Sequence, residues 1–227
     1  MRLLGRAVRR AHGVVAMRLG RIRSSEPLSR NWGYDRGTPI DRHYIEDFLA
    51  RHASDVRGHV LEVQEDEYSR RFGGERVTQQ DVLNVDGGNP RATIIGDLAS
   101  PETLPEGQFD CIVLTQTLHL VFDMSVAIAN IHRALRPEGV VLVTVPGITP
   151  LDRVEFLDSW YWSLTAPALQ RLLSGPFQPD KVTVETHGNL YAASAFLHAA
   201  AVQEVSKHRL DKPDPVYPVT IAARAVK

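Results

Sequence analysis

The sequence has little cysteine: Cys111 is the one thiol among 227 residues. A single thiol cannot form an internal disulfide or supply a cysteine-rich zinc site. Cys111 lies in the apolar run FDCIVL, which is typical of a buried strand, and burial keeps a thiol protonated and unreactive. We therefore expect a structural thiol and a reducing, cytoplasmic setting.

Long apolar runs and an excess of positive charge are also missing. No stretch approaches the ~20 apolar residues that a transmembrane helix needs. The formal net charge of -1 and pI near 6.8 provide no overall positive field for nucleic acid. The nine histidines do not occur at zinc-ligand spacing, so we expect no metal. A phosphate-binding loop and a nucleophile elbow are absent as well.

Positive charge collects at the N-terminus, where the first thirty residues hold eight arginines and one acid, Glu26. Within Met1–Ile22, apolar residues recur at three- and four-residue steps, a pattern typical of an amphipathic helix. We therefore divide the chain into a basic arm, residues 1–30, and a domain, residues 31–227. The arm could contact a membrane surface or a protein partner, or form a solvated tail.

Strand and helix patterns alternate along the rest of the chain. The predicted strands are residues 60–63, 76–78, 92–95, 111–114, 140–147, 181–186 and 219–225. The predicted helices are residues 41–53, capped by Asp41, and 125–135, 160–173 (after an initial loop) and 192–205. The fourth and fifth strands are almost continuously Val, Ile and Leu, which indicates a parallel sheet covered on both faces.

The phrases VLEV, IIGDL, FDCIVLTQTLHLV and LRPEGVVLVTVP follow one another between His59 and Pro146. In this order they resemble the core of the class I S-adenosylmethionine-dependent methyltransferases. GYDRGTPIDR before VLEV, and FGG after it, are similar to methyltransferases often found alongside glycosyltransferases. The resemblance implies a doubly wound α/β fold with a mostly parallel, seven-stranded, Rossmann-like sheet and helices on both faces.

The resemblance also implies methyl transfer from S-adenosylmethionine to an oxygen or nitrogen of a small-molecule acceptor, with a sugar-containing metabolite as one candidate. Glu62 matches the family's acid at the end of the first strand. Gln64, Asp66 and Tyr68 stand where the family has a glycine-rich loop, and their side chains restrict the backbone. Either the loop still holds the cofactor, or the fold serves as a partner-binding subunit or catalyses a different reaction.

In such a sheet the cofactor lies outside the carboxyl ends of the strands. Asp81, about 20 residues after Glu62, would accept from the ribose hydroxyls, with Asp86 as the alternative. Asp97 resembles the acceptor of the adenine amino group, or else caps a helix. The full set implied for the cofactor is Arg36, Glu62, Val63, Gln64, Asp81, Asp97, Leu98, Thr115 and Gln116.

His119, close behind the fourth strand, and His187, after a later strand, are candidate bases for removing the acceptor proton, because imidazole titrates near neutral pH. The alternative for His119 is a packed or exposed helix residue. The aromatic candidates for the acceptor pocket are Tyr34, Trp160, Tyr161 and Trp162, and core packing is the alternative for the last three. We expect a small-molecule substrate, no nucleic acid, and possible oligomers.

Overall fold

The computed structural model describes residues 25–152 and 154–227, so the predicted amphipathic segment lies outside the described residues. The chain divides into two compact units. The larger unit comprises Ile45–Gly147, Leu151–Thr186 and Thr220–Lys227, and the smaller one comprises the described residues up to Tyr44 together with Ile148–Pro150 and His187–Val219. The division into an arm and a domain at residue 30 stays a prediction.

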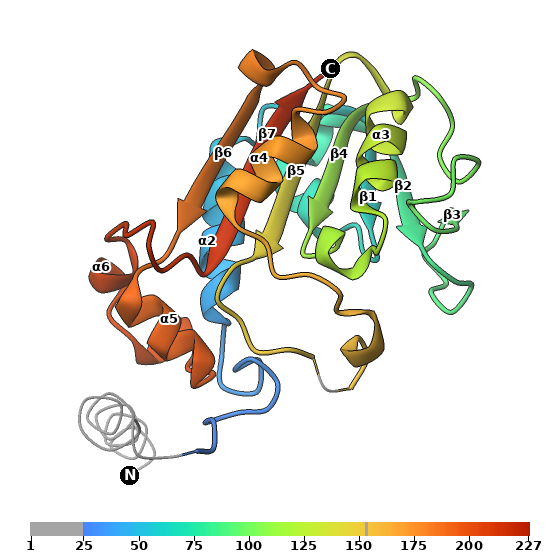
Figure 1. The fold of residues 1–227 in the computed structure, drawn as a ribbon. Helices are drawn as coiled ribbons and strands as arrows, with labels where there is room; N and C mark the ends of the chain where they lie inside the picture. Colours follow the sequence, from blue (N-terminus) through green and yellow to red (C-terminus); the bar gives the residue numbers. More distant parts are fainter. Residues whose placement is uncertain (1–24, 153) are drawn as a thin grey trace. The chain divides into compact units, whose positions relative to one another are not determined.

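The larger unit is built on a seven-stranded sheet with the order β3-β2-β1-β4-β5-β7-β6. Its strands are β1 (Gly58–Val63), β2 (Val77–Asn84), β3 (Ile94–Ile95), β4 (Phe109–Thr115), β5 (Leu135–Pro146), β6 (Val182–His187) and β7 (Thr220–Val226). Strands β1 to β5 pair in parallel, whereas β7 is antiparallel to β5 (Figure 1). The predicted mostly parallel, seven-stranded sheet is confirmed.

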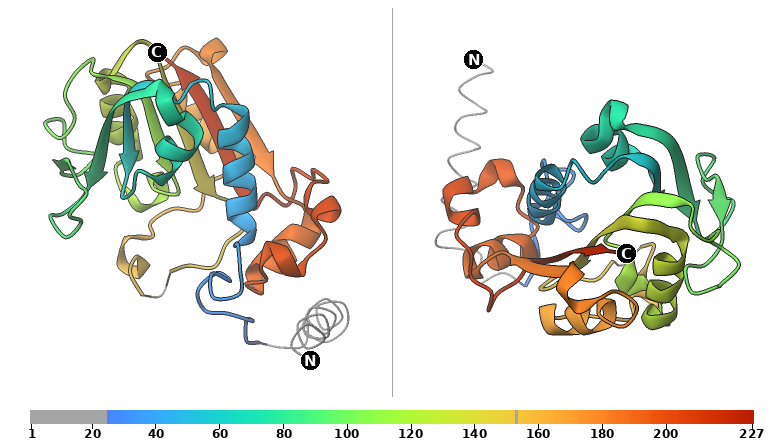
Figure 2. Two further views of the ribbon diagram at one scale, coloured as in Figure 1. Left: turned by 180° about the vertical axis from the view of Figure 1, so that it is seen from behind. Right: turned by 90° about the horizontal axis from the view of Figure 1, so that it is seen from above.

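Helices cover both faces of this sheet because successive side chains of its central strands point to opposite sides (Figure 2). In β4, Ile112 and Leu114 pack on the face of α3 (Met124–Ala134) and α4 (Ala166–Leu173). Cys111 and Val113 pack on the opposite face, against the half of α2 (Ile40–Arg51) that belongs to this unit. Cys111 is a free, fully buried thiol, and burial raises its pKa, as expected for a structural residue.

Several sequence-based boundaries are wrong, and β5 begins at Leu135 rather than at residue 140. Strand β2 continues to Asn84, well past the predicted residue 78. Backbone pairing with β1 holds the polar TQQD stretch in the strand, although that stretch has no apolar pattern from which a strand could be predicted. Helix α5 spans Leu190–Leu197 and does not reach residue 205, since the alanine-rich stretch that follows bends at Ala199, with φ 54°. Helix α2 begins at Ile40, so Asp41 lies in its first turn and does not cap it.

The smaller unit has its own apolar cluster around the short helices α5 and α6 (Lys207–Leu210). The Tyr44 hydroxyl donates to the Leu210 carbonyl at 2.9 Å, which anchors the first turns of α2 to α6. An isolated bridge between Pro39 and Ala201 joins the N-terminal and C-terminal parts of this unit.

Glycine is required at the turn that leads into β1. Gly58 has a φ of 68°, and a Cβ there would lie 2.2 Å from Oδ2 of Asp110. That oxygen accepts hydrogen bonds from the His59 amide at 2.7 Å and from Arg136 at 2.8 Å. A side chain at this position would therefore displace the carboxylate that joins β1, β4 and the start of β5.

We expect Gly58→Ala to lower the free energy of unfolding by about 3 kcal/mol, because it adds backbone strain and a steric clash. Gly107→Ala is the matched control: its φ is 59°, but nothing lies within 4 Å of the added Cβ. The control should lose only about 1 kcal/mol through the left-handed backbone. Equilibrium unfolding in urea measures both values, and equal losses would contradict the role of Asp110.

Candidate functional site

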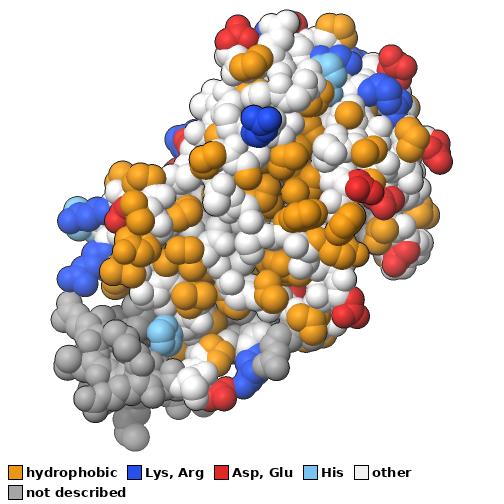
Figure 3. All heavy atoms as spheres, in the orientation of Figure 1, with side chains coloured by type: hydrophobic (Ala, Val, Ile, Leu, Met, Phe, Trp, Pro, Cys, Tyr) orange, Lys and Arg blue, Asp and Glu red, His pale blue; other side chains and the backbone are white. Residues whose placement is uncertain are grey.

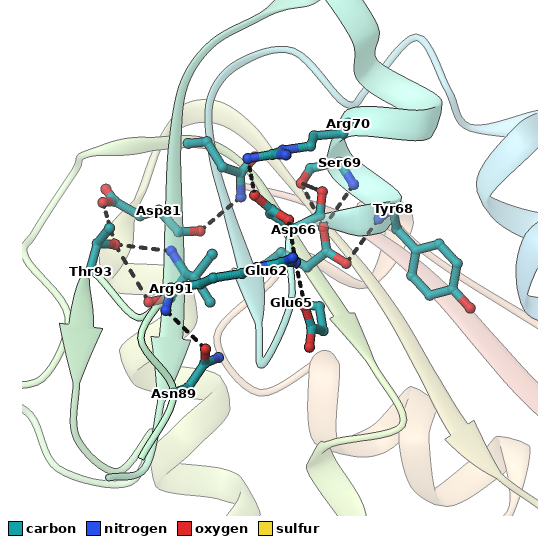
Figure 4. A network of polar contacts seen from close by, with 12 residues as sticks. Glu62, Glu65, Asp66, Tyr68, Ser69, Arg70, Asp81, Asn89, Arg91 and Thr93 are labelled. Atoms are coloured by element: carbon teal, nitrogen blue, oxygen red, sulfur yellow. Dashed lines mark hydrogen bonds and ion pairs between the residues drawn. The ribbon is translucent and has the colours of Figure 1, made fainter. Parts of the chain in front are cut away.

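Glu62, near the end of β1, organises the segment that follows it. Its carboxylate accepts hydrogen bonds from the amides of Tyr68 at 3.1 Å and Ser69 at 2.7 Å, and from the Ser69 hydroxyl at 2.6 Å (Figure 4). The side chain is 2% exposed. Burial raises the pKa of Glu62, and the hydrogen bonds from Ser69 and Tyr68 oppose that rise. The carboxylate therefore closes the loop after β1 against the sheet.

Gln64 occupies the first bend of this loop with a φ of 69°. Side chains other than that of glycine rarely adopt this left-handed conformation. The bend is held on both sides, because the Gln64 amide donates to the Leu83 carbonyl at 2.9 Å and its own carbonyl accepts from the Asn89 side chain. The backbone thus follows a glycine-type path although the residue is glutamine, and the side chains of Gln64 and Glu65 are exposed.

Ion pairs brace the rest of the loop. Asp66 is buried and contacts Arg70 at 2.5 Å and Arg91 at 3.4 Å, and Arg91 also reaches Glu65 at 2.9 Å. The Tyr68 side chain joins the apolar cluster on the α2 face of the sheet, near Phe72, and points away from the ion pairs in Figure 4. Tyr68 is the bulkiest of the three residues that stand where the family has a glycine-rich loop. Its side chain therefore packs in the core and does not cover the ion-paired loop.

Asp81 lies inside β2, opposite Leu61, and not after the strand as predicted. One of its oxygens is 2.6 Å from Nε2 of His59, and the other accepts from the Thr93 hydroxyl at 2.7 Å. Both oxygens therefore have a partner within the protein. Asp86 follows the strand, is exposed, and accepts from the Gly88 amide at 2.9 Å.

Asp97 and Leu98 follow the short strand β3. The exposed Asp97 carboxylate accepts from the Ala99 amide at 2.8 Å, so it closes a local turn rather than capping a helix. The Leu98 side chain is buried in the core on the α3 face, and its carbonyl accepts from the Asn130 side chain at 2.9 Å. Leu98 therefore fixes this turn to α3.

The end of β4 carries a second left-handed bend. Gln116 has a φ of 48°, and its amide donates to the Thr144 carbonyl of β5 at 2.8 Å. Thr117 turns its hydroxyl back to the Thr115 carbonyl at 3.0 Å. Strand β4 pairs with β1 next to Glu62, so the two bends follow neighbouring strands of the sheet.

The hydroxyls of Thr144 and Thr220 are buried without a hydrogen-bond partner among the described residues. Thr144 lies near the carboxyl end of β5, and Thr220 pairs with Pro146 at the start of β7. The sequence analysis did not identify them. For Thr144, a signal was present in the sequence, because it is the one polar residue within the otherwise apolar run VVLVTVP.

His119 lies in the 3-10 turn Leu118–Leu120, directly after the β4 bend. It is 2% exposed, and its ring centroid lies 4.3 Å from that of Trp160. His119 Nδ1 and Trp160 Nε1 are both buried, and neither has a hydrogen-bond partner in the described part of the chain. Burial lowers the pKa of His119 to about 4, so the imidazole is neutral at pH 7.

Three exposed aromatic side chains lie within three residues of this pair along the chain, and we call them the aromatic rim: Phe122, Tyr161 and Trp162, exposed by 62%, 48% and 37%. The Phe122 ring lies 5.3 Å from Tyr161 and 5.7 Å from Trp162. The Trp162 amide donates to the His119 carbonyl at 3.3 Å. Hydrophobic side chains are numerous on the face of the molecule that Figure 3 shows.

Three predicted site residues belong to the smaller unit. The Arg36 guanidinium is paired with Glu204, through Nε at 3.0 Å and a second, close contact from Nη2. The Tyr34 hydroxyl accepts from Arg42 at 2.7 Å, and the His187 ring stacks on Tyr44 with centroids 5.8 Å apart. Their roles in binding or catalysis stay predictions.

The described residues contain no group of three or more histidine, cysteine or acidic side chains that could hold a metal ion. Among the helices that the structure describes, none is long and apolar enough to cross a membrane.

The chain matches the family model described as a methyltransferase domain over residues 26–201. No curated protein sequence matches it. Among solved structures, it is similar to a putative sarcosine dimethylglycine methyltransferase from Galdieria sulphuraria, with a TM-score of 0.57 and 11% identity over 83% of this chain and 89% of that one.

Two further structures are similar to this chain. One is a SAM-dependent methyltransferase from Archaeoglobus fulgidus, with a TM-score of 0.54 and 10% identity over 82% of this chain and 94% of that one. The other is the [4+2]-cyclase SpnF, with a TM-score of 0.54 and 16% identity over 85% of this chain and 84% of that one. At these identities the likeness shows the fold.

The burial of His119 predicts a loss of stability in acid. The unfolded chain protonates this ring near its ordinary pKa of 6.5, whereas the folded protein does so only near 4. Between these values the unfolded state binds more protons, so the free energy of unfolding falls as the pH drops through the window. The loss from this one residue is on the order of 3 kcal/mol.

Urea unfolding at several pH values checks this prediction. His119→Phe should make the dependence on pH between 6.5 and 4 shallower, while His52 and His132, whose pKa values burial also lowers, still contribute to it. The exposed His208→Gln serves as the control that keeps the wild-type slope. A wild-type slope that survives in His119→Phe would contradict the buried, neutral imidazole.

Proposed function

The chain belongs to the methyltransferase-domain family and is an S-adenosylmethionine-dependent methyltransferase, and we propose that its acceptor is an oxygen or nitrogen of a small molecule. The observation that carries the proposal is the buried imidazole of His119, whose Nδ1 has no described partner just beyond the end of β4. In an open α/β sheet, ligands bind outside the carboxyl ends of the strands. A neutral imidazole at that edge is placed to bind and deprotonate an acceptor group.

The residues at this edge fit the cofactor. The backbone bend at Gln64 gives the glycine-type path that lets a ligand approach the main chain, and Val63, Gln64, Thr115 and Gln116 would contact the methionine part. Asp86 is the exposed carboxylate after β2 and would accept from the ribose hydroxyls, in preference to Asp81.

For the adenine, Asp97 would accept from the amino group, and Leu98 would contribute its backbone, because its side chain is buried in the core. Arg36 would pair with the cofactor carboxylate only after its ion pair with Glu204 is broken. S-adenosylmethionine, when bound, supplies a methyl group made electrophilic by its sulfonium.

His119 would position the acceptor and take its proton. The neutral ring does not repel the positive sulfonium, and desolvation makes it a weak base, so alignment of the acceptor contributes more than basicity. His187 is the second candidate base. Trp160, Tyr161, Trp162 and Tyr34 are the proposed acceptor contacts, and aromatic faces of this kind suit a sugar-containing metabolite.

A second candidate function is a repurposed fold that binds a partner or catalyses a different reaction. Asp66 stands where the family has its glycine-rich loop, and its ion pair with Arg91 favours this second candidate. Proteins of this fold do carry other chemistry, because the similar structure SpnF is a [4+2]-cyclase. Binding to a partner also has an example, since a similar structure from Haloferax volcanii is a complex between a methyltransferase activator and a putative methyltransferase.

The cellular setting is also a proposal. The single buried thiol of Cys111 fits a reducing cytoplasm, and the near-neutral net charge of -1 gives no support to a nucleic-acid substrate. The arginine-rich residues 1–30 could attach the enzyme weakly to a membrane surface or a protein, and oligomers are compatible with the sequence.

Two aspartates distinguish a cofactor contact from a structural one. We expect Asp86→Asn to weaken binding of S-adenosylhomocysteine by about tenfold, because the ribose loses a charged acceptor. Asp81→Asn should destabilise the protein through His59 and Thr93, but leave the affinity of the folded fraction unchanged. Isothermal titration calorimetry measures the affinity of each variant for S-adenosylhomocysteine and, as a second ligand, for S-adenosylmethionine. A folded wild-type protein that binds neither ligand would remove the methyltransferase proposal.

A further inference from the structure

We propose that the acceptor group is a carbohydrate hydroxyl, bound between Trp160 Nε1 and His119 Nδ1, with the aromatic rim contacting the sugar ring. This inference rests on the proposed function and specifies its substrate class. It starts from two polar atoms, both buried and both without a described partner, on rings whose centroids lie 4.3 Å apart.

The chemistry of these two atoms selects one kind of group. An indole nitrogen only donates a hydrogen bond, whereas a neutral imidazole with its proton on Nε2 accepts one at Nδ1. A hydroxyl accepts from the first and donates to the second. A carboxylate has no proton for His119, and an alkylamine is protonated at neutral pH and then has no lone pair for Trp160. The pair is therefore complementary to a hydroxyl.

The neighbouring indole makes the missing partner of Trp160 significant. Trp162 Nε1 donates to the carbonyls of Val121 at 3.1 Å and Phe122 at 3.2 Å. The same segment thus satisfies one indole and leaves the other unsatisfied. A buried polar group without a partner destabilises the protein, and a bound hydroxyl would offset this for both atoms at once.

The aromatic rim supplies a surface for the ring that carries the hydroxyl. Its three side chains are exposed although they contact one another, and they come from the same two segments as the buried pair, residues 118–122 and 160–162. Aromatic faces bind the apolar faces of sugar rings, while polar groups at the base of a site fix orientation. A carbohydrate combines both features.

Binding requires a small movement of Trp160, because its indole lies against the His119 ring and both nitrogens are closed off from solvent. In the transfer, the hydroxyl oxygen forms a bond to the methyl carbon, and the carbon–sulfur bond of S-adenosylmethionine breaks with its electron pair left on sulfur. S-adenosylhomocysteine and a methyl ether result. The hydroxyl proton passes to Nδ1 of His119, which becomes positively charged as the sulfonium charge disappears.

The first test observes the indole N–H signals of the full chain by ¹⁵N NMR, with S-adenosylhomocysteine bound. The probes are methyl glycosides of common hexoses and deoxyhexoses, each compared with its amino-sugar and uronic-acid counterpart. We expect at least one neutral glycoside to shift the Trp160 signal more than that of Trp162, whose N–H is already bonded. A Trp160 signal that no glycoside moves, or that only the amine or acid moves, would overturn the inference.

Methyl transfer gives a second readout. With ¹³C-methyl S-adenosylmethionine, the chemical shift of the product methyl should identify an ether formed on the glycoside that moved the Trp160 signal. An N-methyl product would contradict the hydroxyl site and leave the proposed function intact. Failure of S-adenosylhomocysteine to bind the folded protein would instead contradict the proposed function itself.

Variants separate the two atoms from the packing of their rings. Trp160→Phe and His119→Phe keep an aromatic ring and lose one hydrogen-bonding atom, so each should weaken glycoside binding by about tenfold with unchanged affinity for S-adenosylhomocysteine. His132→Phe is the matched control, because that histidine lies on α3 and packs against Phe177, with ring centroids 4.8 Å apart. Wild-type affinity in the Trp160 variant would overturn the site, even if the His119 variant did not fold.

Discussion

The buried carboxylate of Glu62 is the interaction on which this edge of the sheet depends. It accepts three hydrogen bonds from Tyr68 and Ser69, and so ties the start of the following helical turn to β1. A glycine-rich loop would follow its path through backbone freedom alone. Here the bend at Gln64 is held by the Leu83 carbonyl and by Asn89. The Glu62 carboxylate and the ion pairs of Arg91 hold the residues that follow it. The chain replaces flexibility with polar contacts.

This constraint extends to the neighbouring strand. Strands β1 and β4 pair directly, and the bend at Gln116 leads within three residues to the buried ring of His119. In the proposed site, one bend would present backbone to the cofactor, and the other leads to the neutral imidazole of His119 and the Trp160 indole. On this proposal the sheet would fix the methyl donor and the acceptor relative to each other, and alignment of this kind can account for a large share of the acceleration.

The sequence predicted the parts of this structure that depend on apolar periodicity and on local phrases. The aliphatic runs of β4 and β5 indicated a covered parallel sheet, and the structural role of Cys111 followed from its position in one of them. Asp81 was misplaced because the polar residues before it concealed the continuation of β2. Neither the left-handed backbone of Gln64 nor the contact of His119 with Trp160, 41 residues later, has a local signal. Tertiary packing decides both.

Amide hydrogen exchange of the full chain, with and without S-adenosylhomocysteine, tests most directly whether the braced loop still receives the cofactor. The account predicts slower exchange at residues 65–67, after the Gln64 bend, and at residues 85–88, around Asp86. Unchanged exchange in both segments of the folded protein at saturating ligand would contradict it.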